Sequence, residues 1–296
     1  MEKVDSRTVL MEVREALASA DREQLRALSA RVHPHALAEV LPELTVEELV
    51  VLLRLLGDEE VAQLIAELDP RVAAQLLRSL SHTQAADILE EMDPDDATDV
   101  VEELPIVEAE DILRRMAPEE ARYIRELMRY RPESAGGIMT PEFVALSPEI
   151  TAETALRTIR RLAAEKEVIY YVYVTDERDR LLGVLSLRDL VLARPSTRVG
   201  DLMLRDVVKV PVDADQEEVA RLIREHHLLA VPVVDPEQRL LGIVTSDDVA
   251  DVLEEETTED VERLGGSQPL EEPYITARVR HIVRKRVGWL LLLFVA

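Results

Sequence analysis

The chain has 296 residues, of which 47% are hydrophobic and only 3% aromatic, so two domains are possible and any core must be aliphatic. Lys and Arg total 35 against 60 Asp and Glu, and the formal net charge of −25 repels nucleic acid and attracts cations. No cysteine is present, which excludes disulfides, thiolate metal sites and cysteine nucleophiles. We therefore expect no nucleic-acid partner.

An internal repeat occupies the first part of the chain, where the apolar pattern returns every 12 residues from His33 to Met128. Positions five, eight, nine and twelve of each unit are small or apolar, which makes one helix face. The eighth positions are Leu64, Leu76, Ile88, Val100, Ile112 and Ile124. Asp-Pro or Ala-Pro pairs open several units and would cap each new helix. We predict an all-α superhelical solenoid of short helices over residues 1–133, stacked as helical hairpins.

The helical repeat ends before Ser134. Runs rich in β-forming residues follow at residues 168–174, 231–234 and 240–244. A second internal repeat lies here, because residues 176–190 match residues 235–249. Each copy reads strand, helix, strand, turn, strand, helix. We predict a tandem α/β domain, with its first copy at 134–200 and its second copy at 201–252.

The last part of the chain passes from acidic to basic to apolar. We predict a long connecting helix over 253–286, whose basic end carries Arg278, Arg280, Arg284, Lys285 and Arg286. The charge-free run 287–296 is shorter than the roughly 20 residues that span a membrane, but it ends only where the chain ends. Basic residues beside it follow the positive-inside rule, so we predict the start of a first transmembrane helix. The alternative is an apolar helix of a soluble protein.

Acidic residues cluster at helical spacings in three places. Asp95 and Asp99 lie four apart in the solenoid, and Asp215 and Glu217 open the first helix of the second copy. A third group begins at Asp248 and continues into the connecting helix. Mg²⁺ prefers oxygen ligands, and neighbouring carboxylates repel by on the order of 1–4 kcal/mol per pair without it. A solvated acidic face that complements helix dipoles is the structural alternative.

Two runs carry the resemblance to a known family, Gly183–Asp189 and Gly242–Asp248. In each run a strand glycine is followed by Ser or Thr, and an Asp comes three residues later. The tandem resembles a pair of CBS motifs, which implies a pseudo-two-fold α/β unit that dimerises and often holds an adenine nucleotide such as ATP. The resemblance suggests Tyr171, Arg188 and Asp189 as the nucleotide-binding residues. A packed strand tyrosine and a surface arginine are the plain alternatives.

The order of parts is similar to that of the MgtE magnesium channel family, as are the Ala135–Glu142 junction and the Ile169–Tyr173 strand. This resemblance implies a Mg²⁺-sensing region on the cytoplasmic face of the cell membrane, homodimeric through the CBS motifs and joined to a membrane pore domain that is absent here. The acids that it assigns to Mg²⁺ are Asp95, Asp99, Asp215, Glu217, Asp248, Asp251, Glu256, Glu259 and Asp260. Gln63 and His227 stand where the family has acids.

Enzyme motifs are absent from the sequence. The 6 histidines show no HExxH or triad context, and neither Gly-x-Ser-x-Gly nor a phosphate-binding loop occurs. We therefore expect no catalytic residues. The rival hypothesis is a soluble CBS adenine-nucleotide sensor or scaffold, whose solenoid binds a protein partner and which has no channel role.

Overall fold

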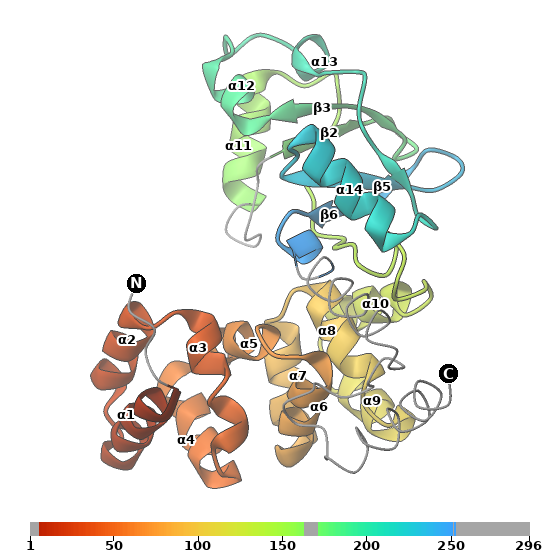
Figure 1. The fold of residues 1–296 in the computed structure, drawn as a ribbon. Helices are drawn as coiled ribbons and strands as arrows, with labels where there is room; N and C mark the ends of the chain where they lie inside the picture. Colours follow the sequence, from red (N-terminus) through yellow and green to blue (C-terminus); the bar gives the residue numbers. More distant parts are fainter. Residues whose placement is uncertain (1–5, 163–170, 251, 253–296) are drawn as a thin grey trace, which may run out of the picture. The chain divides into compact units, whose positions relative to one another are not determined.

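The computed structural model describes residues 6–162, 171–250 and 252. It divides into two compact units, Met1–Val144 and Ala145–Ala296, which are described separately below (Figure 1). The predicted connecting helix and membrane segment, residues 253–296, lie outside the described residues, and the domain boundaries stay predictions. Within the described ranges, no helix is both long and apolar enough to cross a membrane.

The first unit is built from short helices, as the 12-residue repeat predicts. Alternate helices pack together, α5 on α7 and α7 on α9 in one column and α6 on α8 and α8 on α10 in the other, so the predicted solenoid is confirmed. The elements are α1 Ser6–Ser19, α2 Arg22–Arg31, α3 Pro34–Ala38, the 3₁₀ turn η1 Leu41–Glu43, α4 Val46–Leu56, α5 Asp58–Ala66, α6 Pro70–Ser79, α7 His82–Glu90, α8 Pro94–Glu102, α9 Ile106–Leu113 and α10 Pro118–Leu127.

Side-chain caps explain where several of these helices begin. Ser81 and Gln84 form a capping box at α7, and Asp69 accepts hydrogen bonds from the backbone of Arg71 and Val72 at α6. The expectation that Asp-Pro pairs cap through the aspartate is wrong at Asp93, which makes no side-chain cap hydrogen bond at α8.

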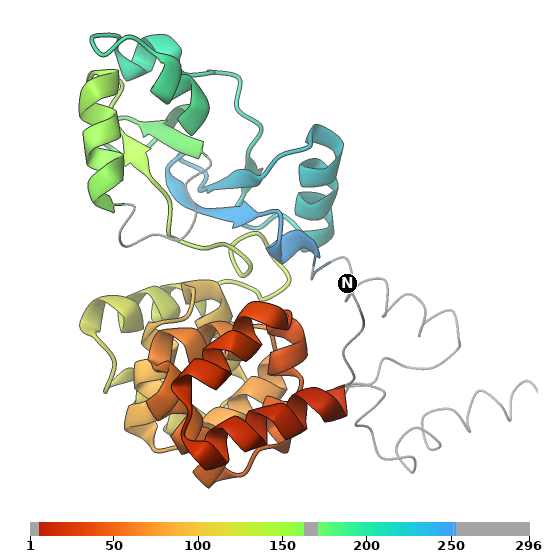
Figure 2. The same cartoon turned by 90° about the vertical axis from the view of Figure 1, so that its left-hand side faces the viewer.

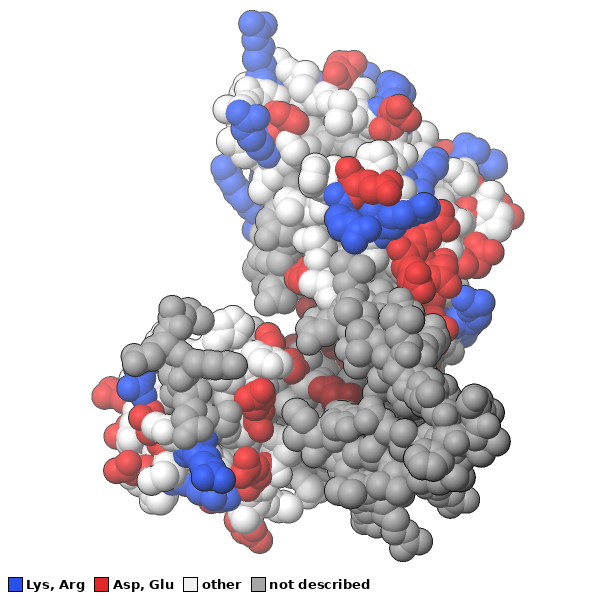
Figure 3. Space-filling view, viewed as in Figure 1, with Lys and Arg blue, Asp and Glu red and all other residues white. Residues whose placement is uncertain are grey.

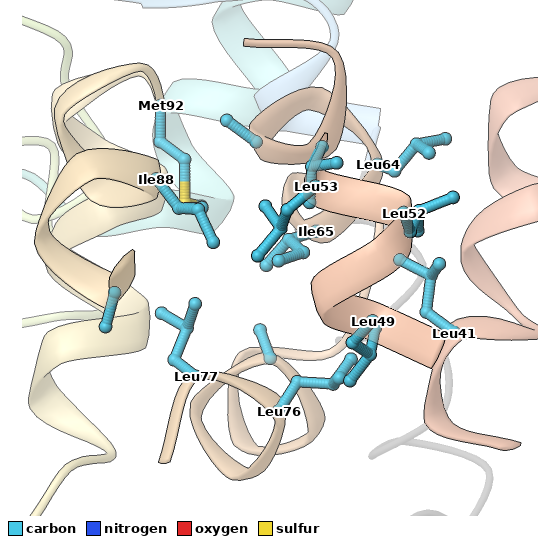
Figure 4. Packing of buried hydrophobic residues seen from close by; sticks show 14 of the residues in the cluster. Leu41, Leu49, Leu52, Leu53, Leu64, Ile65, Leu76, Leu77, Ile88 and Met92 are labelled. Atoms are coloured by element: carbon cyan, nitrogen blue, oxygen red, sulfur yellow. The ribbon is translucent and has the colours of Figure 1, made fainter. Parts of the chain in front are cut away.

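The eighth repeat positions form the middle of the solenoid core, and all six are buried. Figure 4 shows Leu76 and Leu77 of α6 and Ile88 of α7 converging with leucines of α4 and α5 in a single aliphatic cluster. The twelfth position differs at the end of the repeat, because Met128 is 38% exposed. The repeat ends with α10, so Met128 has no following repeat helix to pack against.

Ion pairs join helices along the surface of the solenoid, and in the pairs of longest range the basic residue precedes its acid. The longest-range pairs are Arg14–Glu48, Arg26–Glu60, His35–Glu67, Arg71–Glu103, Arg78–Glu108 and His82–Asp111. Exposed pairs of this kind contribute little stability each. Each pair joins segments that are distant in the sequence, so together the pairs favour one arrangement of the stacked helices.

Truncating one buried and one exposed isoleucine to alanine should show how much the buried side chain contributes to stability. Ile88→Ala leaves a cavity in the cluster of Figure 4 and should cost about 2–5 kcal/mol of unfolding free energy. Ile106→Ala, at a side chain that is 83% exposed, should change it by less than about 0.5 kcal/mol. Urea unfolding of both variants measures the difference, and equal losses would contradict the packing described.

The second unit holds two copies of one fold, each a three-stranded sheet (Figure 2). In each copy a short first strand pairs parallel with the second, and the second pairs antiparallel with the third. The predicted order is confirmed for the first copy and, up to its third strand, for the second copy. The elements are β1 Ala145–Leu146, α11 Ala152–Leu162, β2 Tyr171–Thr175, β3 Leu181–Ser186, α12 Leu187–Leu192 and α13 Val199–Leu202, then β4 Val210–Pro211, α14 Gln216–His226, β5 Ala230–Val234 and β6 Leu240–Thr245.

Reciprocal hydrogen bonds join the two copies at their β2–β3 and β5–β6 turns. The Leu181 N–H donates to the Gln238 carbonyl and the Leu240 N–H donates to the Asp179 carbonyl, each at 2.9 Å. Such an exchange is what a pseudo-two-fold axis requires. Both turns are held by an aspartate: Asp176 accepts from the backbone and side chain of Arg180, and Asp235 does the same from Arg239.

These two carboxylates should make the stability of the second unit depend on acid pH. Hydrogen bonds from Arg180 lower the pKa of Asp176; burial would raise the pKa of Asp235, but hydrogen bonds from the backbone and side chain of Arg239 outweigh it and lower that pKa. A lowered folded-state pKa contributes stability above the unfolded value of about 3.9, and that stability is lost as the pH falls through the folded value.

Asp176→Asn with Asp235→Asn should therefore destabilise the chain at pH 7, and the difference from wild type should shrink below about pH 4. Urea unfolding across this range measures it. Asp213→Asn, at an exposed carboxylate, is the matched control. A difference that stayed constant down to pH 2 would show that the carboxylate charge is not the cause.

Candidate functional site

Helix α8 presents the predicted acids of the solenoid. Asp95 is 8% exposed, whereas Asp99, one turn later, is exposed, so the face they share runs from the interior to the surface. Asp96, half-buried between them, was not in the predicted set. Asp95 and Asp96 lie in the first turn, where carboxylates complement the partial positive charge of the helix end. These acids thus have a local structural role besides any role in cation binding.

In the second copy, the predicted acids Asp215 and Glu217 lie at the start of α14. The Asp215 carboxylate caps the helix by accepting from the Glu217 N–H at 3.1 Å, and both side chains are exposed. His227, at the position where the family has an acid, ends the same helix in the left-handed conformation with a φ of 52°. That conformation is uncommon for side chains other than glycine, asparagine, aspartate and histidine. The exposed Gln63 lies in α5.

Two equivalent turns carry the predicted Asp189 and Asp248. In the first, the Ser186 hydroxyl donates to the Asp189 carboxylate at 2.7 Å and accepts from the Asp189 N–H at 3.0 Å. In the second, one oxygen of Asp248 accepts from the Thr245 hydroxyl at 2.6 Å and from the Thr245 N–H at 3.1 Å. Ser186 and Thr245 were missing from the predicted site, although a hydroxyl followed three residues later by an acid is a recognised capping signature.

The predicted nucleotide residues meet at one end of the first sheet. Tyr171 begins β2 and lies opposite Ser186 in the register of β2 and β3, three residues before Asp189. Tyr171 is half-buried, and Arg188 and Asp189 are exposed. The structure therefore brings a partly accessible aromatic ring next to the turn that carries the guanidinium and the carboxylate. An aromatic face suits a base, a guanidinium suits phosphate, and a carboxylate suits ribose hydroxyls.

The predicted Mg²⁺ ligands are distributed over both units. Among them, Asp251, Glu256, Glu259 and Asp260 lie outside the described residues. Of the residues that the structure describes, no three His, Asp or Glu side chains are grouped so that they could hold a metal ion. Asp95 and Asp99 belong to the first unit and Asp215, Glu217 and Asp248 to the second. Figure 3 shows acidic side chains spread over the surface of both units.

Asp248→Ala should show how much the Asp248 carboxylate contributes to stability without any bound cation. Loss of its bonds with the Thr245 hydroxyl and N–H should cost about 1 kcal/mol of unfolding free energy with no divalent cation present. Asp248→Asn keeps an acceptor oxygen and should cost less. The matched control is Asp247→Ala at the exposed neighbour, which should be nearly neutral. Thermal denaturation in a chelator decides whether Asp248 has this capping role.

A helical solenoid followed by two pseudo-symmetric copies with a hydroxyl-x-x-Asp turn defines a CBS-pair regulatory protein. Comparison with known families agrees with this class. The model of the MgtE intracellular N domain matches residues 32–133, and the CBS domain model matches residues 135–196 and 199–255.

Curated relatives match part of the chain. The chain is 51% identical over 170 residues to the magnesium transporter MgtE of Thermus thermophilus, which is 57% of this chain and 38% of that protein. It is 42% identical over 170 residues to that of Enterococcus faecalis, 57% of this chain and 37% of that protein. The chain thus spans about two fifths of the length of the curated relatives it matches.

Solved structures extend the likeness across both units. The soluble part of a magnesium transporter is 34% identical with a TM-score of 0.78, covering 85% of this chain and 99% of that one. The cytosolic domain of the Mg²⁺ channel MgtE in complex with ATP is 42% identical with a TM-score of 0.75, covering 82% of this chain and 99% of that one. The chain belongs to the MgtE family, whose members are magnesium transporters and not enzymes.

Proposed function

We propose that this chain is the cytosolic magnesium-sensing region of an MgtE-type magnesium channel. The observation that carries the proposal is its 42% identity to the cytosolic domain of the Mg²⁺ channel MgtE over 99% of that chain. That likeness includes the solenoid and both CBS copies in order. It supports a place on the cytoplasmic face of a cell membrane, next to the pore domain of the transporter.

Magnesium would act on the acidic surfaces of the two units. Mg²⁺ keeps several waters and binds carboxylates loosely, so cations shared between acids respond to its concentration. Bare carboxylates repel, and shared cations remove that repulsion, which biases a two-state arrangement of the units. We propose that Mg²⁺ bound by the nine predicted acids draws the units and the connecting helix together and shuts the pore. Low Mg²⁺ lets the units separate and the pore open.

The chain would act as a homodimer through its CBS motifs. Val191 and Leu192 of α12 and the nearby Leu204 are each at least 60% exposed. Apolar side chains gathered on one surface mark an interaction site more often than scattered ones do. A second copy of the chain is the occupant that we propose for this surface of the first CBS copy.

An adenine nucleotide would bind at Tyr171, Arg188 and Asp189. The support is twofold: these residues meet at one end of the first sheet, and the similar cytosolic domain is described in complex with ATP. We propose ATP or another adenine nucleotide as the ligand. It would add a second input to the magnesium response.

The rival function is a soluble CBS nucleotide sensor whose solenoid docks a protein. One observation favours it. Ile106 and Val107, which open α9, are 83% and 80% exposed, whereas neighbouring units place proline or polar residues at these repeat positions. An exposed aliphatic pair on a solenoid can anchor a protein partner.

Small-angle scattering with a Mg²⁺ titration across the millimolar range tests the magnesium function, on the chain shortened to end near Glu272. We expect the radius of gyration to fall as Mg²⁺ rises and to recover with chelator. Asp99→Asn with Glu217→Gln removes one exposed acid from each unit and should shift the midpoint to higher Mg²⁺ by at least about threefold. The forward scattering reports whether the chain is a dimer.

A matched variant, Glu23→Gln with Glu153→Gln, removes the same charge from exposed positions outside the predicted set. It should leave the midpoint close to wild type. A radius that is unchanged at every Mg²⁺ concentration would reject the sensor and favour the soluble scaffold. Equal shifts in both variants would mean that net charge alone sets the response.

A further inference from the structure

The last two helices of the repeat, α9 and α10, form one end of the solenoid. Figure 1 shows them at the opposite end of the first unit from α1 and α2. A solenoid stays soluble when its terminal repeats have a polar outer face, because no neighbouring repeat covers them. The outer face of α9 and α10 should therefore be polar.

The repeat itself shows which side chains point toward the next helix of a column. At the second repeat position of α7, His82 contacts Asp111 of α9, the next helix in its column. At the third position of α6, Arg71 pairs with the glutamate that follows α8. Ile106 and Val107 occupy these second and third positions in α9. They therefore face the place that a further helix would take, and they are 83% and 80% exposed.

Helix α10 has the expected polar face, whereas α9 does not. On α10, Arg122 pairs with Glu126, and its guanidinium lies 4.6 Å from the centre of the Tyr123 ring. On α9 the aliphatic pair Ile106 and Val107 is open to solvent instead. An exposed apolar pair at the point where the column could be extended marks a contact surface.

The charge of this end differs from that of the preceding repeat units. Between Pro105 and Arg131 there are six acids and six arginines, so this segment is neutral. Between Gly57 and Leu104 there are 14 acids and two arginines. Copies of a chain with a net charge of −25 repel each other, and that repulsion is smallest where the surface is locally neutral.

The order of charges along α9 is complementary to a second copy of the same helix. Glu102 and Glu103 come just before α9, Arg114 and Arg115 follow it, and all four are exposed. If two copies of α9 lie antiparallel about a two-fold axis, the acids of each face the arginines of the other. The aliphatic stems of the arginines can then cover the apolar pair. Glu103 and Arg115 also have ion pairs within the chain, but these are exposed and contribute little.

We propose that the α9 end of the solenoid binds the same end of a second copy, through Ile106 and Val107 and about a two-fold axis. The rival function above assigns this pair to another protein, but the charge balance of the end favours a second copy. The inference is independent of the magnesium and nucleotide proposals. It also uses a surface different from the one proposed for the CBS dimer, so the two contacts together can join dimers into larger assemblies.

The contact surface is small, so the association is weak. Helices of 8 and 10 residues are about 12 and 15 Å long and about 10 Å across, and together they present a face of roughly 300 Å². A standard interface takes about 800 Å² from each partner. The contact gains strength where chains are already linked, because linking raises their effective concentration.

Sedimentation equilibrium of the intact chain, from about 10 µM to about 1 mM in about 0.15 M salt, tests the proposal. The background variant is Val191→Asp with Leu192→Asp, which removes the apolar surface proposed for the CBS dimer. Self-association should remain in this background. Adding Ile106→Ser with Val107→Thr should raise its dissociation constant by at least about tenfold, because two aliphatic side chains per copy are lost from the contact.

A charge exchange tests the two-fold geometry in the same background. Arg114→Glu with Arg115→Glu gives a copy with acids at both ends of α9, and Glu102→Arg with Glu103→Arg gives a copy with arginines at both ends. Neither variant should self-associate. An equimolar mixture should associate again, because the acids of one copy then face the arginines of the other. A mixture that stays dissociated would overturn the antiparallel pairing.

The matched control, Val46→Thr with Leu229→Ser, removes two other exposed aliphatic side chains and should leave the association unchanged. Thermal denaturation of each variant reports its folding. Association that persists in full after Ile106→Ser with Val107→Thr, or no association at any concentration, overturns the proposal. Loss of association on Met11→Ser, at the α1 end of the solenoid, would show head-to-tail stacking and would overturn it as well.

Discussion

The chain must bury a core that has few aromatic side chains although 60 of its residues are acidic and costly to bury, and this constraint shapes both units. Aliphatic side chains fill space well between thin elements, so the first unit uses short helices that each bury one stripe. The second unit uses two small sheets, each with helices beside it. In both, some acids fall at helix starts and turns, where they accept backbone hydrogen bonds, as Asp69 and Asp215 do.

At these positions one carboxylate can both cap local structure and bind a cation. Asp215 and Asp248 accept hydrogen bonds that end or begin local structure, and Asp95 lies in the first turn of its helix. A cation that binds such a carboxylate meets a group that is already oriented, which lowers the cost of ordering it. The same orientation makes a pattern of acids a poor guide to function, because a cap and a ligand place the same residue at the same position.

Duplication explains much of the second unit. The reciprocal hydrogen bonds of Leu181 and Leu240 need both turns to have the same backbone conformation, so that conformation cannot change in one copy alone. The side chains beside the turns can differ between the copies. Tyr171 against Ala230 and Arg188 against Asp247 are differences that leave the backbone unaltered. A pseudo-symmetric pair can thus differ in its side chains while both copies keep the same backbone.

The sequence alone determined the solenoid, the two copies and the order of their elements, because a 12-residue aliphatic period and a repeated strand-turn-strand run are properties of neighbours along the chain. It also suggested Tyr171, Arg188 and Asp189 as nucleotide-binding residues, but only through resemblance. Only the tertiary structure decided that Asp93 does not cap its helix, that Met128 stays exposed, and that Asp95 is buried while Asp99 is not. It alone paired Tyr171 with Ser186 and Ala230 with Thr245. The physical reason is that burial and register depend on which segments meet in space, and periodicity specifies a helix face or a strand without naming the partner that covers it.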